Sequence, residues 1–278
     1  GCPSVGRASD WKYISFLSTS QAGASSLTDC VFRFGGLWSD PMVEVNGVSF
    51  PVTNCTFESG AEAGLKIIDA SVPVTGCTFR DNLFALELTG TSTAEQITNN
   101  FILGQNSNTD SYAVVVPADC IADLVTNNTF ERRDDGRFGR IGIASSTLTQ
   151  SATWPVPPDS MVYHLPGNNS LSIAGSAMPV LTLLQKTAFK FGSVQEGLRT
   201  ARVIVGSGGA LVADEVVFTS FRDDSSFGDS DGGCPSVGRA SDWKYISFLS
   251  TSQAGASSLT DCVFRFGGLW SDPMVEVN

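Results

Sequence analysis

The hexapeptide VTNCTF at residues 52–57 returns with small changes four more times in the first 130 residues. The other copies are LTDCVF (27–32), VTGCTF (74–79), ITNNFI (97–102) and VTNNTF (125–130). In each copy an aliphatic residue, a threonine and a small or polar residue precede an anchor, which is Cys30, Cys55, Cys77, Asn100 or Asn128. Successive anchors are 25, 22, 23 and 28 residues apart, the spacing of a short structural repeat.

Short apolar runs lie between the anchors, and their pattern predicts strands. The runs at residues 42–45, 65–68, 84–88 and 112–116 are β-branched or alternating and have turn residues nearby. No amphipathic stretch long enough for a helix is present in the sequence, and residues 147–232 continue with short strands and glycine-rich turns. Units of about 23 residues with two or three short strands each predict an all-β solenoid of stacked parallel coils.

The anchors and the phenylalanines that follow them resemble the right-handed parallel β-helix of the pectin-lyase-like superfamily. This resemblance implies a right-handed parallel β-helix (β-solenoid) whose coils stack like residues on one another. Asn100 would then lie beneath Asn128, and Cys30, Cys55 and Cys77 would form a stack of buried small side chains. Disulfides between coils are the alternative interpretation for these cysteines.

A longer repeat contains the short one: residues 233–278 repeat residues 1–46 letter for letter. We therefore expect residues 1–232 to be one solenoid unit of about ten coils, at about 23 residues per coil, and residues 233–278 to begin the next unit. Within the unit, residues 1–146 hold the anchored coils. Residues 147–232 hold a second set of coils that ends in an acidic loop.

The loop at residues 222–232, called the joint loop below, is expected to link one unit to the next. We expect the last coil of the unit, at residues 218–221, to stack directly on the opening strand of the second copy, at residues 243–248. The residues predicted to form this joint are all aromatic: Trp11, Phe16, Phe218, Phe221, Trp243 and Phe248.

The composition limits the partners of the chain. Its 17 Lys and Arg against 28 Asp and Glu give a net charge of −11, which argues against nucleic acid and anionic membranes as partners. No apolar run is long enough to span a bilayer, so no membrane insertion is expected. Only 16% of residues are charged, a composition that favours an extracellular or cell-surface β-protein.

The joint loop carries four carboxylates, Asp223, Asp224, Asp229 and Asp231. Hard cations such as Ca²⁺ take six to eight oxygen ligands, which aspartates and serines on a flexible loop can supply. The spacing is not that of an EF-hand loop, and two interpretations stay open. The loop is either a solvated acidic surface or a Ca²⁺ site, and no other cofactor is expected.

No residue is predicted to be catalytic. A glycosidase needs two carboxylates about 5–9.5 Å apart, whereas the charged cluster at residues 131–137 places its acids in one hydrophilic turn. His164 is the only histidine, and no nucleophile motif lies near it, so a structural or surface role is favoured.

Glycans enter the prediction in two ways. Three sequons begin at Asn54, Asn127 and Asn168, and each is a possible glycosylation site if the source glycosylates. Three tryptophans, Trp11, Trp38 and Trp154, could bind sugars if exposed, or could equally seal the contact between units.

These observations favour a non-enzymatic structural repeat of an extracellular fibre, surface layer or adhesin stalk. Its expected partners are copies of itself, in tandem and laterally, and glycans under the adhesive alternative. The alternatives are a carbohydrate-active enzyme of the same fold, such as a polysaccharide lyase or hydrolase, and a glycan-binding adhesin or tailspike-like module.

Overall fold

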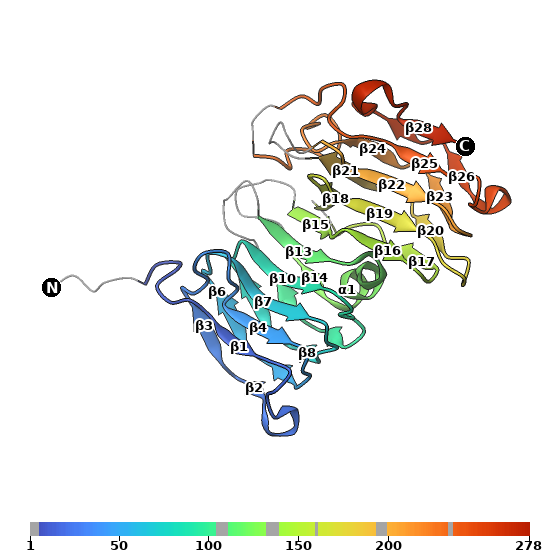
Figure 1. Cartoon of the computed structure of the whole chain (residues 1–278). Helices are drawn as coiled ribbons and strands as arrows, with labels where there is room; N and C mark the ends of the chain where they lie inside the picture. The colour runs from blue at the N-terminus through green and yellow to red at the C-terminus, as the bar shows by residue number, and fades with distance from the viewer. Residues whose placement is uncertain (1–5, 104–110, 132–138, 159–160, 193–198, 233–235) are drawn as a thin grey trace. The chain divides into compact units, whose positions relative to one another are not determined.

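The computed structural model describes residues 6–103, 111–131, 139–158, 161–192, 199–232 and 236–278 (Figure 1). Nearly all regular structure in these residues is β, and the strands form parallel sheets in which most strands pair with the third strand after them. This is the architecture of a parallel β-solenoid, so the predicted fold class is confirmed. The chain divides into two compact units, residues 1–116 with 123–135 and residues 117–122 with 136–278.

Unit 1 stacks its strands in three rows, called rows 1, 2 and 3 in chain order. Row 1 contains β1 (Ile14–Phe16), β4 (Val43–Asn46), β7 (Ala63–Ile68), β10 (Phe84–Thr89) and β13 (Tyr112–Val116). Row 2 contains β2 (Leu27–Thr28), β5 (Val52–Thr53), β8 (Val74–Thr75) and β11 (Ile97–Thr98). Row 3 contains β3 (Val31–Arg33), β6 (Thr56–Glu58), β9 (Thr78–Arg80), β12 (Phe101–Ile102) and β14 (Thr129–Phe130).

Unit 2 also has three rows, numbered in the same way. Row 1 contains β15 (Gly139–Ile143), β18 (Met161–Pro166), β21 (Ala188–Gly192), β24 (Val217–Ser220) and β27 (Val263–Phe264). Row 2 contains β16 (Ser146–Leu148), β19 (Ser170–Ile173), β22 (Arg202–Val205), β25 (Ile246–Phe248) and β28 (Val275–Val277). Row 3 contains β17 (Ala152–Trp154), β20 (Val180–Leu183), β23 (Ala210–Asp214) and β26 (Ser258–Thr260).

Between β13 and β14, where each earlier coil has a row-2 strand, the chain forms a helix that the sequence analysis did not predict. After the one-turn 3-10 helix η2 (Ala118–Cys120), the helix α1 (Ile121–Asn127) includes the first residues of the hexapeptide at 125–130. Pro117 sets φ at −59° just before η2, and Ile121, Leu124 and Val125 lie buried on one helical face. The remaining short helices are η1 (Ala22–Ala24), η3 (Ala254–Ala256) and η4 (Leu269–Ser271).

The third residue of the hexapeptide makes the corner between rows 2 and 3. Asp29, Asn54, Gly76 and Asn99 have φ between 53° and 68°, a left-handed conformation that Gly, Asn and Asp adopt most easily. This requirement explains why the position varies only among small or polar residues. The corner then sends the anchor side chain inward and the strand of row 3 onward.

The solenoid has fewer turns than the sequence analysis predicted. Before the second copy begins, the described strands make five turns in unit 1, and three turns and one strand in unit 2. The difference from about ten coils arises in unit 2, where loops lengthen the turns. Strands β24 and β27 begin at Val217 and Val263, so that turn is about twice as long as a turn of unit 1.

Candidate functional site

The five anchors lie at one corner of unit 1 and are linked by hydrogen bonds that run from coil to coil. The backbone N–H of Cys55 donates to Sγ of Cys77 at 3.4 Å, and the N–H of Cys77 donates to Oδ1 of Asn100 at 2.8 Å. The N–H of Asn100 in turn donates to Oδ1 of Asn128 at 3.0 Å. We call this chain of contacts the ladder; Cys30 lies at its first position and is partly exposed.

The anchor side chains also donate to the backbone of the preceding coil. Asn100 donates through Nδ2 to the carbonyl of Val74 at 2.9 Å, and Asn128 does so to the carbonyl of Ile97 at 2.8 Å. Cys77 directs Sγ toward the carbonyl of Val52 at 3.6 Å. Cysteine and asparagine therefore fill the same role, as an acceptor for one buried amide and a donor to one buried carbonyl.

The cysteines of the described residues are free thiols. Burial raises the pKa of the Cys77 thiol to about 12 and raises that of Cys55 as well. The phenylalanines after the anchors form a second stack beside them, with Phe57 4.9 Å from Phe79 and 5.0 Å from Phe32. A further ladder residue, Asn82, accepts from the amide of Gly60 and donates to the carbonyl of Phe57, and no repeated motif marks it in the sequence.

The second copy of the 46-residue repeat forms the last part of unit 2 and pairs in register with the strands before it. Strand β25 pairs with β22 through Val203 and Ile246, β26 pairs with β23, and β27 pairs with β24. Within the copy, β25 pairs with β28 through Ile246 and Val275, the same register by which Ile14 pairs with Val43 in the first copy. The repeated residues thus keep their internal pairing in both copies.

The predicted stacking of residues 218–221 on residues 243–248 is wrong. Strand β24, which holds Phe218, pairs with β27, and the ring of Phe218 stacks on that of Phe264 at 5.1 Å. The opening strand β25 instead pairs with β22. The reason is that β25, the next strand after β24, lies in row 2, so it continues the same coil and does not stack on β24.

The aromatic residues predicted to form the joint lie at different places in the structure. Trp243 is fully buried, stacks on Phe191 at 4.4 Å and donates from Nε1 to the carbonyl of Arg265. Phe221 is buried against His164, with ring centroids 4.2 Å apart. The other members are Phe248, which is buried, and Trp11 and Phe16, which are half-buried.

The same residues differ in burial between the two copies. Ile14 in β1 is 42% exposed, whereas its equivalent Ile246 in β25 is fully buried. Trp11 donates to the carbonyl of Arg33 just as Trp243 does to that of Arg265, so the local structure is kept. The difference in burial comes from β22 and its neighbours, which cover the second copy.

A buried lysine holds the joint loop in place. Lys190 of β21 is fully buried, and its Nζ donates to the carbonyls of Asp223 and Gly228 and to Oγ of Ser230, at 2.9 to 3.0 Å. Burial lowers the pKa of Lys190 to about 8, and the four aspartates of the loop oppose that shift. The acidic loop therefore surrounds the ammonium group of Lys190, a cation of the protein itself. The sequence around Lys190 does not reveal this role.

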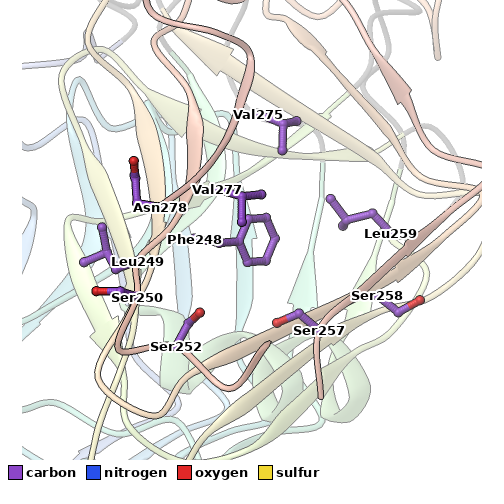
Figure 2. Close-up of a pocket in the computed structure, with 10 residues that line it drawn as sticks. All are labelled: Phe248, Leu249, Ser250, Ser252, Ser257, Ser258, Leu259, Val275, Val277 and Asn278. Carbon is purple, nitrogen blue, oxygen red and sulfur yellow. The ribbon is translucent and has the colours of Figure 1, made fainter. Parts of the chain in front are cut away.

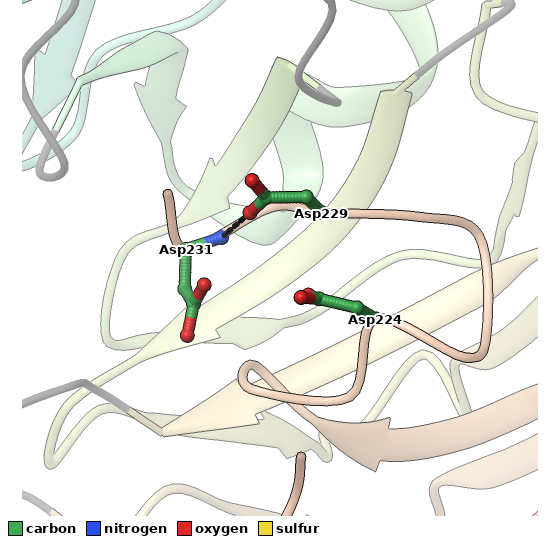
Figure 3. Close-up of side chains that lie close together, drawn as sticks. All are labelled: Asp224, Asp229 and Asp231. Carbon is green, nitrogen blue, oxygen red and sulfur yellow. Dashed lines mark hydrogen bonds between the residues drawn. The ribbon is translucent and has the colours of Figure 1, made fainter. Parts of the chain in front are cut away.

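The four carboxylates of the loop separate into two groups. Asp223 accepts from Oγ1 of Thr219 at 2.7 Å and lies 3.6 Å from Nη1 of Arg265. Asp224, Asp229 and Asp231 converge, with one carboxylate oxygen of each within 4.8 Å of the others (Figure 3). Partial burial and the charges of Asp231 and Asp229 raise the pKa of the Asp224 carboxyl. Three carboxylates beside an ammonium group fit a structural loop better than a site for Ca²⁺, which takes six to eight oxygens.

His164 is a core residue. It is buried, its Nε2 lies 2.9 Å from the carbonyl oxygen of Gly192, and burial holds its pKa well below the usual value, with a further contribution from Arg140. A neutral, enclosed imidazole has no access to substrate. The charged cluster at residues 131–137 lies outside the described residues except for Glu131, which is exposed.

The surface features predicted to meet glycans vary in exposure. The three sequon asparagines, Asn54, Asn127 and Asn168, are all exposed. Among the tryptophans, Trp154 is fully buried, whereas Trp38 is 81% exposed and its second-copy equivalent Trp270 is 75% exposed.

No family model matches the chain. No curated protein and no solved structure matches it either. The parallel solenoid fold therefore rests on the strand pairing of the chain itself. Among the described residues no helix is both long and apolar enough to cross a membrane.

Proposed function

We propose that the chain is a structural repeat of an extracellular fibre, surface layer or adhesin stalk, in which solenoid units stack end to end. The observation that carries this proposal is the pairing of the second copy with the preceding strands β22, β23 and β24. An identical 46-residue sequence opens the chain and also continues the solenoid at residues 236–278, with strand pairing in all three rows. A sequence that begins a unit and also extends one is what a stacked array requires.

The contact around the second copy has the properties of a permanent joint. Trp243 and Ile246 are fully buried, and Oγ of Ser220 donates to Oδ2 of Asp242 at 2.6 Å inside the contact. Parallel pairing satisfies the backbone groups of the last coil, which would otherwise form an open edge. Load along such an array would be shared by the backbone hydrogen bonds of three rows.

Electron microscopy of the native material tests this proposal. We expect filaments or stalks whose length is a multiple of a constant unit. Purified chains with one, two and three complete repeats should give particles that lengthen by equal steps. Dispersed particles of one size from the native source, or release of sugar products from acidic polysaccharides, would contradict a structural role.

A second candidate, glycan binding, is favoured by one observation. Trp38 and Trp270 are strongly exposed at equivalent sites, and both have left-handed φ values, 59° and 58°. Aromatic rings held outward are typical of carbohydrate-binding surfaces, where apolar sugar faces stack on them. A glycan array with the Trp38→Ala, Trp270→Ala double variant distinguishes this candidate, since selective binding should disappear in the variant.

A further inference from the structure

An apolar pocket of about 520 Å³ opens at the last coil of unit 2 (Figure 2). It belongs wholly to the second copy, and its apolar side chains come from β25, β26 and β28. Serines border it on one side in Figure 2. The lining residues are Phe248, Leu249, Ser250, Ser252, Ser257, Ser258, Leu259, Val275, Val277 and Asn278.

The first copy contains the same surface, and there the surface is covered. Phe16 is the equivalent of Phe248, and the ring of Phe50 packs against it at 4.6 Å. Leu27 is the equivalent of Leu259, and it pairs with Val52 of the next coil. Phe50 and Val52 are buried in that position.

The exposed fraction of one valine shows that the covering coil is missing at the second copy. Val45 is fully buried in the first copy, whereas its equivalent Val277 is 81% exposed. An exposed valine beside a phenylalanine and a leucine is an unfavourable surface for water, because apolar area in contact with solvent raises the free energy. The pocket therefore has the shape and chemistry of a surface that a further coil covers.

The backbone hydrogen bonds of the first copy point to the same occupant. In the first copy the N–H of Leu27 donates to the carbonyl of Pro51, and the N–H of Asp29 donates to that of Thr53, both at 3.0 Å. The equivalent donors at the last coil are the amides of Leu259 and Asp261.

We propose that this pocket binds a second copy of the segment Gly47 to Glu58, which adds to β26 and β27 as a new pair of strands. Addition of a strand to an open sheet edge combines main-chain hydrogen bonds with side-chain pockets. Here Phe50 of the segment would fill the pocket beside Phe248, and Val52 would pair with Leu259. The inference rests on the proposed function, because the following unit of a stacked array would supply this segment.

The test uses the full chain extended after Asn278 by a second copy of residues 47–80. Hydrogen exchange followed by NMR or mass spectrometry reports on the amides of Leu259 and Asp261. We expect both to exchange at least about tenfold more slowly in the extended chain than in the original, because the added coil accepts their hydrogen bonds. Equal exchange rates in the two chains would overturn the inference.

Matched variants separate pocket filling from a general effect of the added residues. Val277→Asp in the extended chain should abolish the protection, since a carboxylate would be forced against the incoming Phe50. Trp270→Asp, an equally exposed apolar site outside the pocket lining, should leave the protection intact. Protection that survives Val277→Asp would also overturn the inference.

The outcome is independent of the test of the proposed function. Slow exchange at Leu259 and Asp261 together with native material that forms no filaments would support the pocket and reject the fibre. Filaments together with unchanged hydrogen-exchange rates at Leu259 and Asp261 would support the fibre and reject the pocket. The contact between units would then lie elsewhere.

Discussion

At the scale of single residues, the ladder explains why both cysteine and asparagine occur at the anchor position of the repeat. Each anchor must accept a hydrogen bond from the amide of the preceding anchor and approach a carbonyl of the preceding coil. Asn100 does both with its amide group, and Cys77 does both with its thiol. Their stacked positions could be predicted from the sequence because the anchors recur at a regular spacing. The hydrogen bonds themselves could not, since they depend on the corner geometry.

This role gives a direct prediction for Asn100. Asn100→Leu keeps the branching of the side chain but cannot accept from the buried amide of Cys77, and a buried amide without a partner costs about 1–3 kcal/mol. We expect the free energy of unfolding to fall by that amount, measured by urea denaturation. Asn100→Cys should lose less, because a thiol already serves at the preceding anchor. An equal loss in the two variants would contradict the ladder.

Lys190 predicts an unusual dependence of stability on pH. Its pKa is about 8 in the folded chain and near 10.5 in the unfolded chain. Between these values the unfolded state binds more protons, so this group makes the folded state more stable as pH rises, by up to about 1.4 kcal/mol per pH unit. Below pH 8 the contribution is constant. Urea denaturation at pH 7.5 and pH 9.5 measures the change.

The control for this effect is Lys190→Met, which keeps the length of the side chain and removes its charge. The thiols of the unfolded chain also titrate in this range, near about pH 8.5, so the difference between the two proteins isolates Lys190. We expect the stability difference between the wild type and the Met variant to change with pH over this range. A difference that stays constant would show that Lys190 keeps its ordinary pKa.

At the scale of secondary structure, most strands could be predicted, and the exceptions have local causes. The apolar runs at 65–68, 84–88 and 112–116 coincide with β7, β10 and β13. The helix α1 was missed because it is only seven residues long and overlaps a copy of the hexapeptide. The pairing of β25 with β22 was not predicted, because the length of the joint loop does not show in which row the next strand lies.

The strands β1 and β25 have the same sequence but differ in burial, so the same substitution can be compared in both. Ile246→Ala should cost about 2–5 kcal/mol, the range for a fully buried isoleucine. Ile14→Ala changes the same residue in the same local sequence, but should cost less than about 1 kcal/mol because its side chain already meets solvent. Thermal or urea denaturation of both variants checks this. Equal costs would show that β25 is not covered by β22.

At the scale of the whole molecule, the fold class could be predicted but the site could be predicted only in part. The period of the anchors fixes a parallel solenoid, because only stacked coils bring such spacings together. The part played by Lys190 could not be found, since a single lysine between two phenylalanines gives no signal until the joint loop folds over it.

Stability should depend on the number of repeats. In a stacked array each interior unit contacts two neighbours, whereas a single unit has two uncovered ends. We expect chains with two or three complete repeats to melt at higher temperature than the 278-residue chain, with the gain per repeat decreasing as the array grows. Calorimetry on the series measures this. A melting temperature independent of repeat number would mean that the units fold without mutual support.

The uncovered ends have a practical consequence for handling the protein. Val31 in β3 and Val277 in β28 lie exposed on sheet edges with free strand-pairing capacity, and such edges are the usual starting points of aggregation. A lysine at either position, as Val31→Lys or Val277→Lys, places a charge where a stray strand would dock. We expect these two changes to raise the concentration up to which the chain stays monodisperse in light scattering.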